Sequence, residues 1–306
     1  MTIDPLTDES RGADIELSVV IPCLNEARSL GRVVDEAKAM LTRFGIAGEV
    51  VVADNGSIDG SAEIASAHGA RVVHVPVRGY GSALRGGTEG SHGTYVVFAD
   101  ADGQHDLEGI GRIFDKLREG FDLVVGNRFA GGIQRGSMAF SHRYIGNPII
   151  SGLLRLLFHP KIHDAQCGMR GFSRAAFAQM DTRTTGFEFS PEMVVKAVRH
   201  HLKMTEVPIT VKPDDRDRPP HLRTIPDGWR HLVFLLMCSP TWLFIIPGVT
   251  LLAAGIGLVS WIATGEQHIG RLALDTRGEL FGTLLASIGF DVASIGFFAR
   301  VFSYYE

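Results

Sequence analysis

The first half of the chain alternates short apolar runs with longer stretches of helical periodicity. The runs are rich in β-branched residues, as buried strands are, and lie at residues 17–22, 49–53, 71–75, 94–99 and 122–125. Between them, apolar residues recur at helical spacing at residues 29–44, 57–68, 80–91 and 107–119. This alternation predicts an α/β fold in which helices cover both faces of a parallel sheet.

The C-terminal part carries two long apolar runs. Residues 241–263 contain no charge and are long enough to cross a bilayer. Residues 280–303 form a weaker run because they include Asp291 and Arg300. We predict two transmembrane helices, with Asp291 facing protein or water because a carboxylate facing lipid is costly. The alternatives are two buried helices of a soluble core, or a re-entrant or surface position for the second run.

The charges beside these runs predict an orientation. Residues 196–231 contain eight Lys and Arg against five Asp and Glu, whereas residues 265–279 contain two against three. The positive side of a membrane protein faces the cytoplasm. We therefore expect a multi-pass protein of the inner or cell membrane, with its large N-terminal domain and both chain ends in the cytoplasm.

Three parts are expected along the chain. Residues 1–16 are acidic and lack an apolar core, which predicts a short disordered leader and not an export signal. Residues 17–228 form the expected α/β domain, and residues 229–306 the membrane-associated region. Residues 227–238 fit either an interfacial amphipathic helix or the start of a longer transmembrane helix. The membrane helices are the expected place for contacts in an oligomer.

Composition narrows the class of protein. Of the 306 residues, 45% are hydrophobic and 21% charged, as in globular proteins. The formal net charge of −4 provides no case for a nucleic-acid partner. Cys23, Cys167 and Cys238 have no metal-ligand spacing, which fits a reducing cytosol and argues against a disulfide framework.

Polar residues follow four of the predicted strands. Ligands of such sheets bind beyond the carboxyl ends of the strands. The polar residues at these ends are Asn25, Glu26, Asp54, Asn55, Asp100, Asp102, Asn127 and Arg128. Because all four ends should meet at one edge of the sheet, we predict a binding site there.

Asp100 and Asp102 stand one residue apart after an apolar strand, followed by Gln104. In extended chain two such carboxylates point to the same side. They suit a hard divalent cation, Mg²⁺ or Mn²⁺, that bridges a diphosphate. An ordinary polar turn is the alternative.

Other motifs support weaker interpretations. Asp54 and Glu26 are candidates for contacts to a base or ribose, although the first also fits a turn before a helix capped by Ser57. The glycine-rich segment 79–87 lacks the spacing and lysine of a phosphate loop, so its glycines are expected to allow close helix–sheet packing. Segment 164–170 offers an acid, an amide and an arginine together.

Eight segments in this order resemble glycosyltransferase family 2, in the branch of dolichyl-phosphate mannosyltransferases and bacterial polyprenyl-phosphate glycosyltransferases. They are VVIPCLNE, VVADNGSIDGS, VVFADADGQHDLE, LVVGNRF, DAQCGMRGF, GFEFSPEMVVKA, EVPI and DGWRHLVFLLMCSP. The resemblance covers residues 17–240.

The resemblance implies a GT-A fold and an inverting transfer of a hexose from a GDP- or UDP-linked sugar to a polyprenyl monophosphate. By position, the family's nucleotide contacts fall on Pro22, Asn25, Glu26 and Asp54, and its metal and diphosphate contacts on Asp100, Asp102 and Gln104. Arg128 matches a phosphate-binding arginine and Asp164 an acid near the reaction centre. The chain departs from the family at Asn55, where an acid is usual, and at residues 216–221, where a Gly-x-Ser-Lys loop is usual.

An ionised phosphate acceptor needs no strong general base. The candidates for holding donor and acceptor phosphates are Arg128, Arg143 and either Arg216 or Arg218. Two alternatives remain: an enzyme of the same fold with a polysaccharide or glycan acceptor, and a membrane scaffold or flippase-like protein with an inactive nucleotide domain.

Overall fold

The computed structural model describes residues 15–213, 224–264, 267–269, 272–274 and 276–305. Most of the predicted leader, together with Arg216 and Arg218, lies outside the described residues. The chain divides into two compact units, Met1–His231 and Leu232–Glu306.

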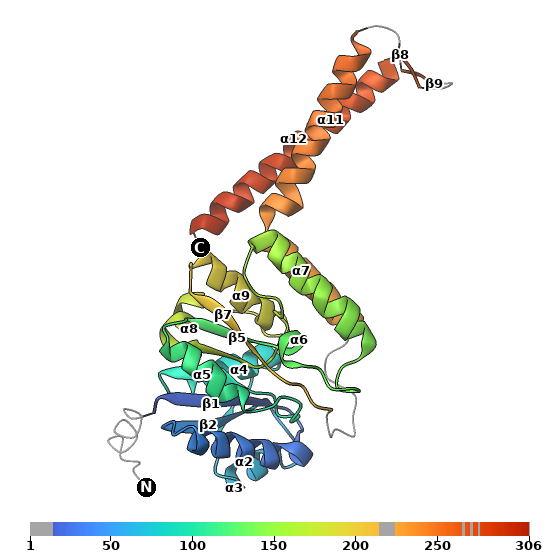
Figure 1. Ribbon diagram of the computed structural model, residues 1–306. Helices are drawn as coiled ribbons and strands as arrows, with labels where there is room; N and C mark the ends of the chain where they lie inside the picture. The colour runs from blue at the N-terminus through green and yellow to red at the C-terminus, as the bar shows by residue number, and fades with distance from the viewer. Residues whose placement is uncertain (1–14, 214–223, 265–266, 270–271, 275, 306) are drawn as a thin grey trace. The chain divides into compact units, whose positions relative to one another are not determined.

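The first unit is built on a seven-stranded sheet of order β3-β2-β1-β4-β6-β5-β7 (Figure 1). Its strands are β1 (Leu17–Cys23), β2 (Gly48–Asp54), β3 (Arg71–His74), β4 (Tyr95–Phe98), β5 (Leu123–Asn127), β6 (Arg170–Ser173) and β7 (Met204–Pro208). The first four pair in parallel, but β6 runs antiparallel to both β4 and β5. The α/β class is confirmed, and the expectation of a wholly parallel sheet is wrong.

Helices cover both faces of this sheet. On one face lie α2 (Ala27–Arg43), α3 (Ser61–Ala67) and α5 (Gly109–Arg118), and on the other lie α4 (Tyr80–Glu89), α8 (Arg174–Met180) and α9 (Phe189–Arg199). The helix predicted from Ser57 begins only at Ser61, after Gly60 in the left-handed region. The α4 glycines do pack closely: a methyl group on Gly87 would come within 2.5 Å of Val20.

The second unit is a helical hairpin. After α10 (Thr224–Met237), which belongs partly to each unit, come η3 (Thr241–Ile245), α11 (Ile246–Ile262), the short strands β8 (Gln267–Ile269) and β9 (Leu272–Leu274), and α12 (Thr276–Tyr305). Thr241–Ile262 and Thr276–Val301 are long and apolar enough to cross a membrane, with mean hydropathies of 2.2 and 1.6. Only 11% and 22% of their most apolar stretches are buried, whereas core helices of a soluble domain would be mostly buried.

Small residues hold the hairpin together. A methyl group on Gly248 would meet the backbone of Ala293, and one on Gly289 would meet the backbone of Leu252, so α11 and α12 approach at backbone distance. We refer to these close contacts as the glycine seam. The sequence predicts that Asp291 faces either protein or water. It is exposed on α12, so it does not pack against protein within the described residues.

Candidate active site

A cavity of about 590 Å³ lies within the first unit, a size that suits a small organic ligand. Six predicted site residues line it: Pro22, Glu26, Asp100, Asp102, Gln104 and Arg128. They lie in or just after the carboxyl ends of β1, β4 and β5, because these ends meet at one edge of the sheet.

Asp100 is held from two sides. Its Oδ1 accepts a hydrogen bond of 3.2 Å from the Tyr80 hydroxyl, and its Oδ2 lies 3.3 Å from His105 Nδ1. Burial opposes ionisation, but these two contacts and the cation of Arg128 keep the pKa of Asp100 below its usual range. Gly168 must lack a side chain, since a Cβ there would overlap the Asp100 carboxylate. The carboxylate is therefore charged and fixed.

Asp102 lies on the same turn and is half-buried, as Asp100 is. Its Oδ1 accepts the backbone N–H of Gln104 at 3.0 Å, and the Gln104 side chain donates to the Ser137 carbonyl at 3.4 Å. Among the described residues, no group of three or more His, Cys, Asp and Glu could hold a metal ion. Two carboxylates nevertheless fit Mg²⁺ or Mn²⁺, because Mg²⁺ commonly takes one or two carboxylates and fills its other positions with substrate phosphates and water.

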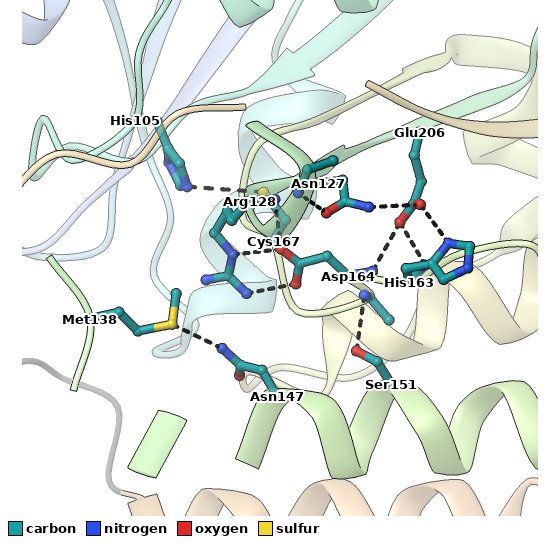
Figure 2. Close-up of polar contacts among 12 residues, drawn as sticks. His105, Asn127, Arg128, Met138, Asn147, Ser151, His163, Asp164, Cys167 and Glu206 are labelled. Carbon is teal, nitrogen blue, oxygen red and sulfur yellow. Dashed lines mark hydrogen bonds and ion pairs between the residues drawn. The ribbon is translucent and has the colours of Figure 1, made fainter. Parts of the chain in front are cut away.

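Arg128 lines the cavity and is paired with Asp164 (Figure 2). Its Nε and Nη2 each donate to Asp164 at 2.8 Å, and its backbone N–H donates to the same carboxylate at 3.0 Å. Burial disfavours the charged guanidinium, but the adjacent Asp164 keeps the pKa of Arg128 above its usual value. Asp164 is fully buried, so this predicted site residue orients Arg128 and does not reach the cavity surface.

Three further predicted residues do not line the cavity. Asn25 accepts the backbone N–H of Ile58 at 2.9 Å, which joins two loops. Asp54 is buried and accepts the backbone N–H groups that follow β2, including that of Ser57 at 3.0 Å. Arg143 lies on η2 (His142–Gly146) with its guanidinium 5.3 Å from the centre of the Tyr144 ring.

The cavity also contains residues that the sequence motifs did not identify as site residues. Tyr80 and Phe187 line it and stack with their ring centres 5.0 Å apart. Asn55, one of the polar residues expected at the strand ends, lines it as well; its Nδ2 donates to the carbonyls of Val75 and Val77, and its Oδ1 accepts the backbone N–H of Gly79. The side chain of Asn55 thus fixes the loop between β3 and α4.

His142 is another cavity residue that the motifs did not identify. Burial and the neighbouring Arg128 cation lower its pKa, so its imidazole is neutral near pH 7.

An exposed apolar strip adjoins one wall of the cavity. That wall includes Met138, Ala139, His142 and Asn147. The same segment continues through η2 into α7 (Asn147–Phe158), and each side chain of the strip is more than half exposed. The strip consists of Phe140, Tyr144, Ile145, Ile149 and Leu156. Several large exposed apolar side chains on one surface segment mark a contact with another apolar phase or protein.

Comparison with known proteins agrees with this geometry. A model of glycosyl transferase family 2 matches residues 18–180. The hexosyltransferase Agl6 of low-salt glycan biosynthesis in Haloferax volcanii is 37% identical over 288 residues, which are 94% of this chain and 69% of that protein. A dolichyl-phosphate hexose transferase of the same organism is 30% identical over 195 residues, 63% of this chain and 82% of that protein.

A solved structure supports the fold. Glucosyl-3-phosphoglycerate synthase from Mycobacterium tuberculosis, in complex with Mn²⁺, UDP and glucosyl-3-phosphoglycerate, superposes with a TM-score of 0.57 at 22% identity, over 76% of this chain and 82% of that one. A family model that matches more than half of the chain, and a relative that aligns over nearly all of it, identify the same group of proteins. The chain therefore belongs to glycosyltransferase family 2 and is a glycosyltransferase of GT-A fold.

Proposed function

We propose that this enzyme transfers a hexose from a nucleoside diphosphate sugar to a polyprenyl monophosphate at the cytoplasmic surface of the membrane. The observation that carries the proposal is the apolar strip beside a cavity whose lining includes Asp100, Asp102 and Arg128. A soluble acceptor would not require apolar side chains at the cavity wall, whereas a lipid with a charged headgroup would.

The carboxylates and Arg128 suit the donor. Asp100 and Asp102 would hold Mg²⁺ or Mn²⁺, which when bound neutralises charge on the diphosphate. The synthase from M. tuberculosis has been solved with Mn²⁺ and UDP and with Mg²⁺ and UDP. Arg128, already oriented by Asp164, points its remaining donors at the cavity, where they would stabilise the leaving diphosphate.

The acceptor phosphate would act as its own nucleophile. The second pKa of a phosphate monoester is about 6, so the acceptor is largely a dianion at neutral pH. Both oxygens of Asp164 are engaged by Arg128, so this acid is not poised to take a proton. Attack opposite the leaving group inverts the configuration at the anomeric carbon.

His142 favours a second candidate. A neutral imidazole in the cavity could remove a proton from a sugar hydroxyl, which suits a polysaccharide or glycan acceptor. This candidate requires a base, and the lipid-phosphate proposal does not.

The membrane assignment rests on independent features. α11 and α12 are long enough to span, and the excess of Lys and Arg at residues 196–231 favours a cytoplasmic first unit in a multi-pass protein of the cell membrane. The dolichyl-phosphate hexose transferase among the relatives is named for a lipid phosphate acceptor. An oligomer formed through the membrane helices stays a prediction.

An acceptor screen tests the proposal. The detergent-solubilised enzyme is incubated with radiolabelled UDP- and GDP-hexoses, Mn²⁺, and either undecaprenyl phosphate or soluble glycans. We expect label in the organic phase only with the lipid phosphate, and little change on His142→Ala. Label only in soluble glycan, abolished by His142→Ala, would establish the second candidate instead.

A further inference from the structure

Glu206 on β7 accepts hydrogen bonds from four donors at the edge of the active site (Figure 2). One oxygen accepts the backbone N–H groups of His163 at 2.7 Å and Asp164 at 2.9 Å. The other accepts Asn127 Nδ2 and His163 Nδ1, both at 3.0 Å. The side chain is only 12% exposed, so water does not replace these partners easily.

These four bonds join the two segments that present Arg128. Asn127 ends β5, and its Oδ1 caps α6 (Arg128–Gly131) by accepting the backbone N–H of Ala130 at 2.9 Å. Asp164 belongs to the other segment and accepts two hydrogen bonds from the Arg128 guanidinium. Glu206 thus links the end of β5, which precedes Arg128, to the loop that contains Asp164. The Asp164 carboxylate orients the Arg128 guanidinium.

The direction of the guanidinium depends on this arrangement. Asp164 occupies Nε and Nη2, and among the described residues no hydrogen bond from Nη1 is seen. Since Arg128 lines the cavity while Asp164 is fully buried, the pair places Nη1 on the ligand side. A small shift of residues 163–164 would turn the Arg128 guanidinium away from the ligand.

We propose that Glu206 is a positioning residue for transfer: it holds Asn127 and the 163–164 loop in place, so that Arg128 meets the charge developing on the leaving diphosphate. The inference rests on the proposed role of Arg128 towards the donor, and it holds for any acceptor. Misplacement of a catalytic group by about 1 Å can cost about 100-fold in rate.

Glu206→Gln tests the proposal. A carboxamide puts an NH₂ group where two of the four donors point, so the side chain keeps its size but loses half of its acceptor capacity. We expect kcat to fall at least tenfold while the donor KM changes less than threefold, because the affected interaction forms in the transition state.

Glu49→Gln is the matched control. Glu49 also accepts several hydrogen bonds, from Ser18, Arg71 and the His92 backbone, and is 14% exposed, but it lies at the start of β2 and outside the cavity lining. It should lower thermal stability without changing kcat. If Glu206→Gln does not fold, Asn127→Ala removes the same link from the other side and should lower kcat alone in the same way.

A double-mutant cycle decides whether Glu206 acts through Arg128. In an Arg128→Lys background, which lacks the paired fork, Glu206→Gln should lower kcat less than twofold further. A full additional tenfold loss, or an unchanged kcat in the wild-type background, would overturn the proposal. Hydrolysis of the donor without lipid is measured in parallel, so the cycle reports on Glu206 even if the lipid acceptor is wrong.

Discussion

At the scale of single residues, Asp100 and Asp102 share one turn but have different surroundings. Asp100 is bound by Tyr80 and contacts His105, whereas the cavity-lining Asp102 accepts the backbone N–H of Gln104. The first carboxylate is oriented by its neighbours, and both line the cavity in which a cation would bind.

Asp102→Asn should abolish transfer while the fold stays intact, because the proposed role of the charge is to bind a metal. We expect at least a 100-fold loss in kcat, in line with the loss of a group that organises transition-state charge. Asp106→Asn, a neighbouring acid outside the cavity lining, serves as the control and should stay active. Near-normal turnover of Asp102→Asn in Mn²⁺ or Mg²⁺ would refute the metal assignment.

Asn55→Asp restores the acid usual in the family but should weaken this protein. The carboxylate cannot donate to the carbonyls of Val75 and Val77, and Asn55 is buried, so we expect a loss of about 1–3 kcal/mol in the free energy of unfolding. The donor KM should rise, because the loop carries Arg78 and Tyr80 to the cavity. Thermal unfolding measures the loss of stability, and donor kinetics measure the change in KM. A variant as stable as the wild type would contradict the proposed role of the Asn55 hydrogen bonds.

Strand-end chemistry located six residues of the cavity lining, and its ambiguity explains why other predicted residues do not line the cavity. Short polar side chains form turns and bind ligands with the same atoms. Asp100 and Asp102 line the cavity, whereas the side-chain oxygens of Asn25 and Asp54 accept hydrogen bonds from backbone N–H groups. Glu206 could not be singled out because its partners come from segments about 40 and 80 positions away in the chain.

At the scale of elements, alternation of runs located the first five strands but could not reveal the last two. β6 has four residues, Arg170–Ser173, and only Phe172 is a large apolar residue among them. β7, at the sheet edge, has the mixed sequence MTEVP. The periodicity of apolar residues does not indicate strand direction. The antiparallel position of β6 between β4 and β5 could therefore not be predicted from the sequence.

The glycine seam predicts a clear contrast between two glycines of the hairpin. Gly289→Leu would drive a side chain into the backbone of α11, whereas nothing lies within 4 Å of a Cβ on Gly257. We expect Gly289→Leu to destabilise the hairpin by about 1–3 kcal/mol or more and Gly257→Leu to be tolerated. Thermal unfolding in detergent compares them. Equal stability of both variants would show that the helices do not pack as described.

At the scale of the whole molecule, the boundary between catalytic and membrane parts falls inside α10. The boundary predicted at residue 228 also lies inside α10, which runs from Thr224 to Met237, and a ring nitrogen of His231 is hydrogen-bonded to the backbone of the cavity residue Phe187. A chain cut after Asp227 would lose that contact, so the informative truncation ends at Met237.

This truncation should bind UDP or GDP with Mn²⁺ as the full chain does, because the cavity is lined by residues of the first unit alone. It should lose at least tenfold in kcat/KM on long-chain lipid acceptors, which need the membrane helices for delivery. Calorimetric titration and lipid assays measure the two effects. A folded truncation unable to bind either nucleotide would overturn this division of roles.

In the proposed reaction an ionised lipid phosphate is the nucleophile. Undecaprenyl phosphate and undecaprenol differ only in that group, and removal of the phosphate raises the acceptor pKa far above neutral and takes away the partner of the arginines. The direct measurement is thin-layer separation of radiolabelled lipid after incubation of the full-length enzyme with each acceptor. We predict label on the phosphate lipid alone, in an acid-labile product whose anomeric configuration is inverted relative to the donor. Equal labelling of the free alcohol, or retention of configuration, would contradict the account.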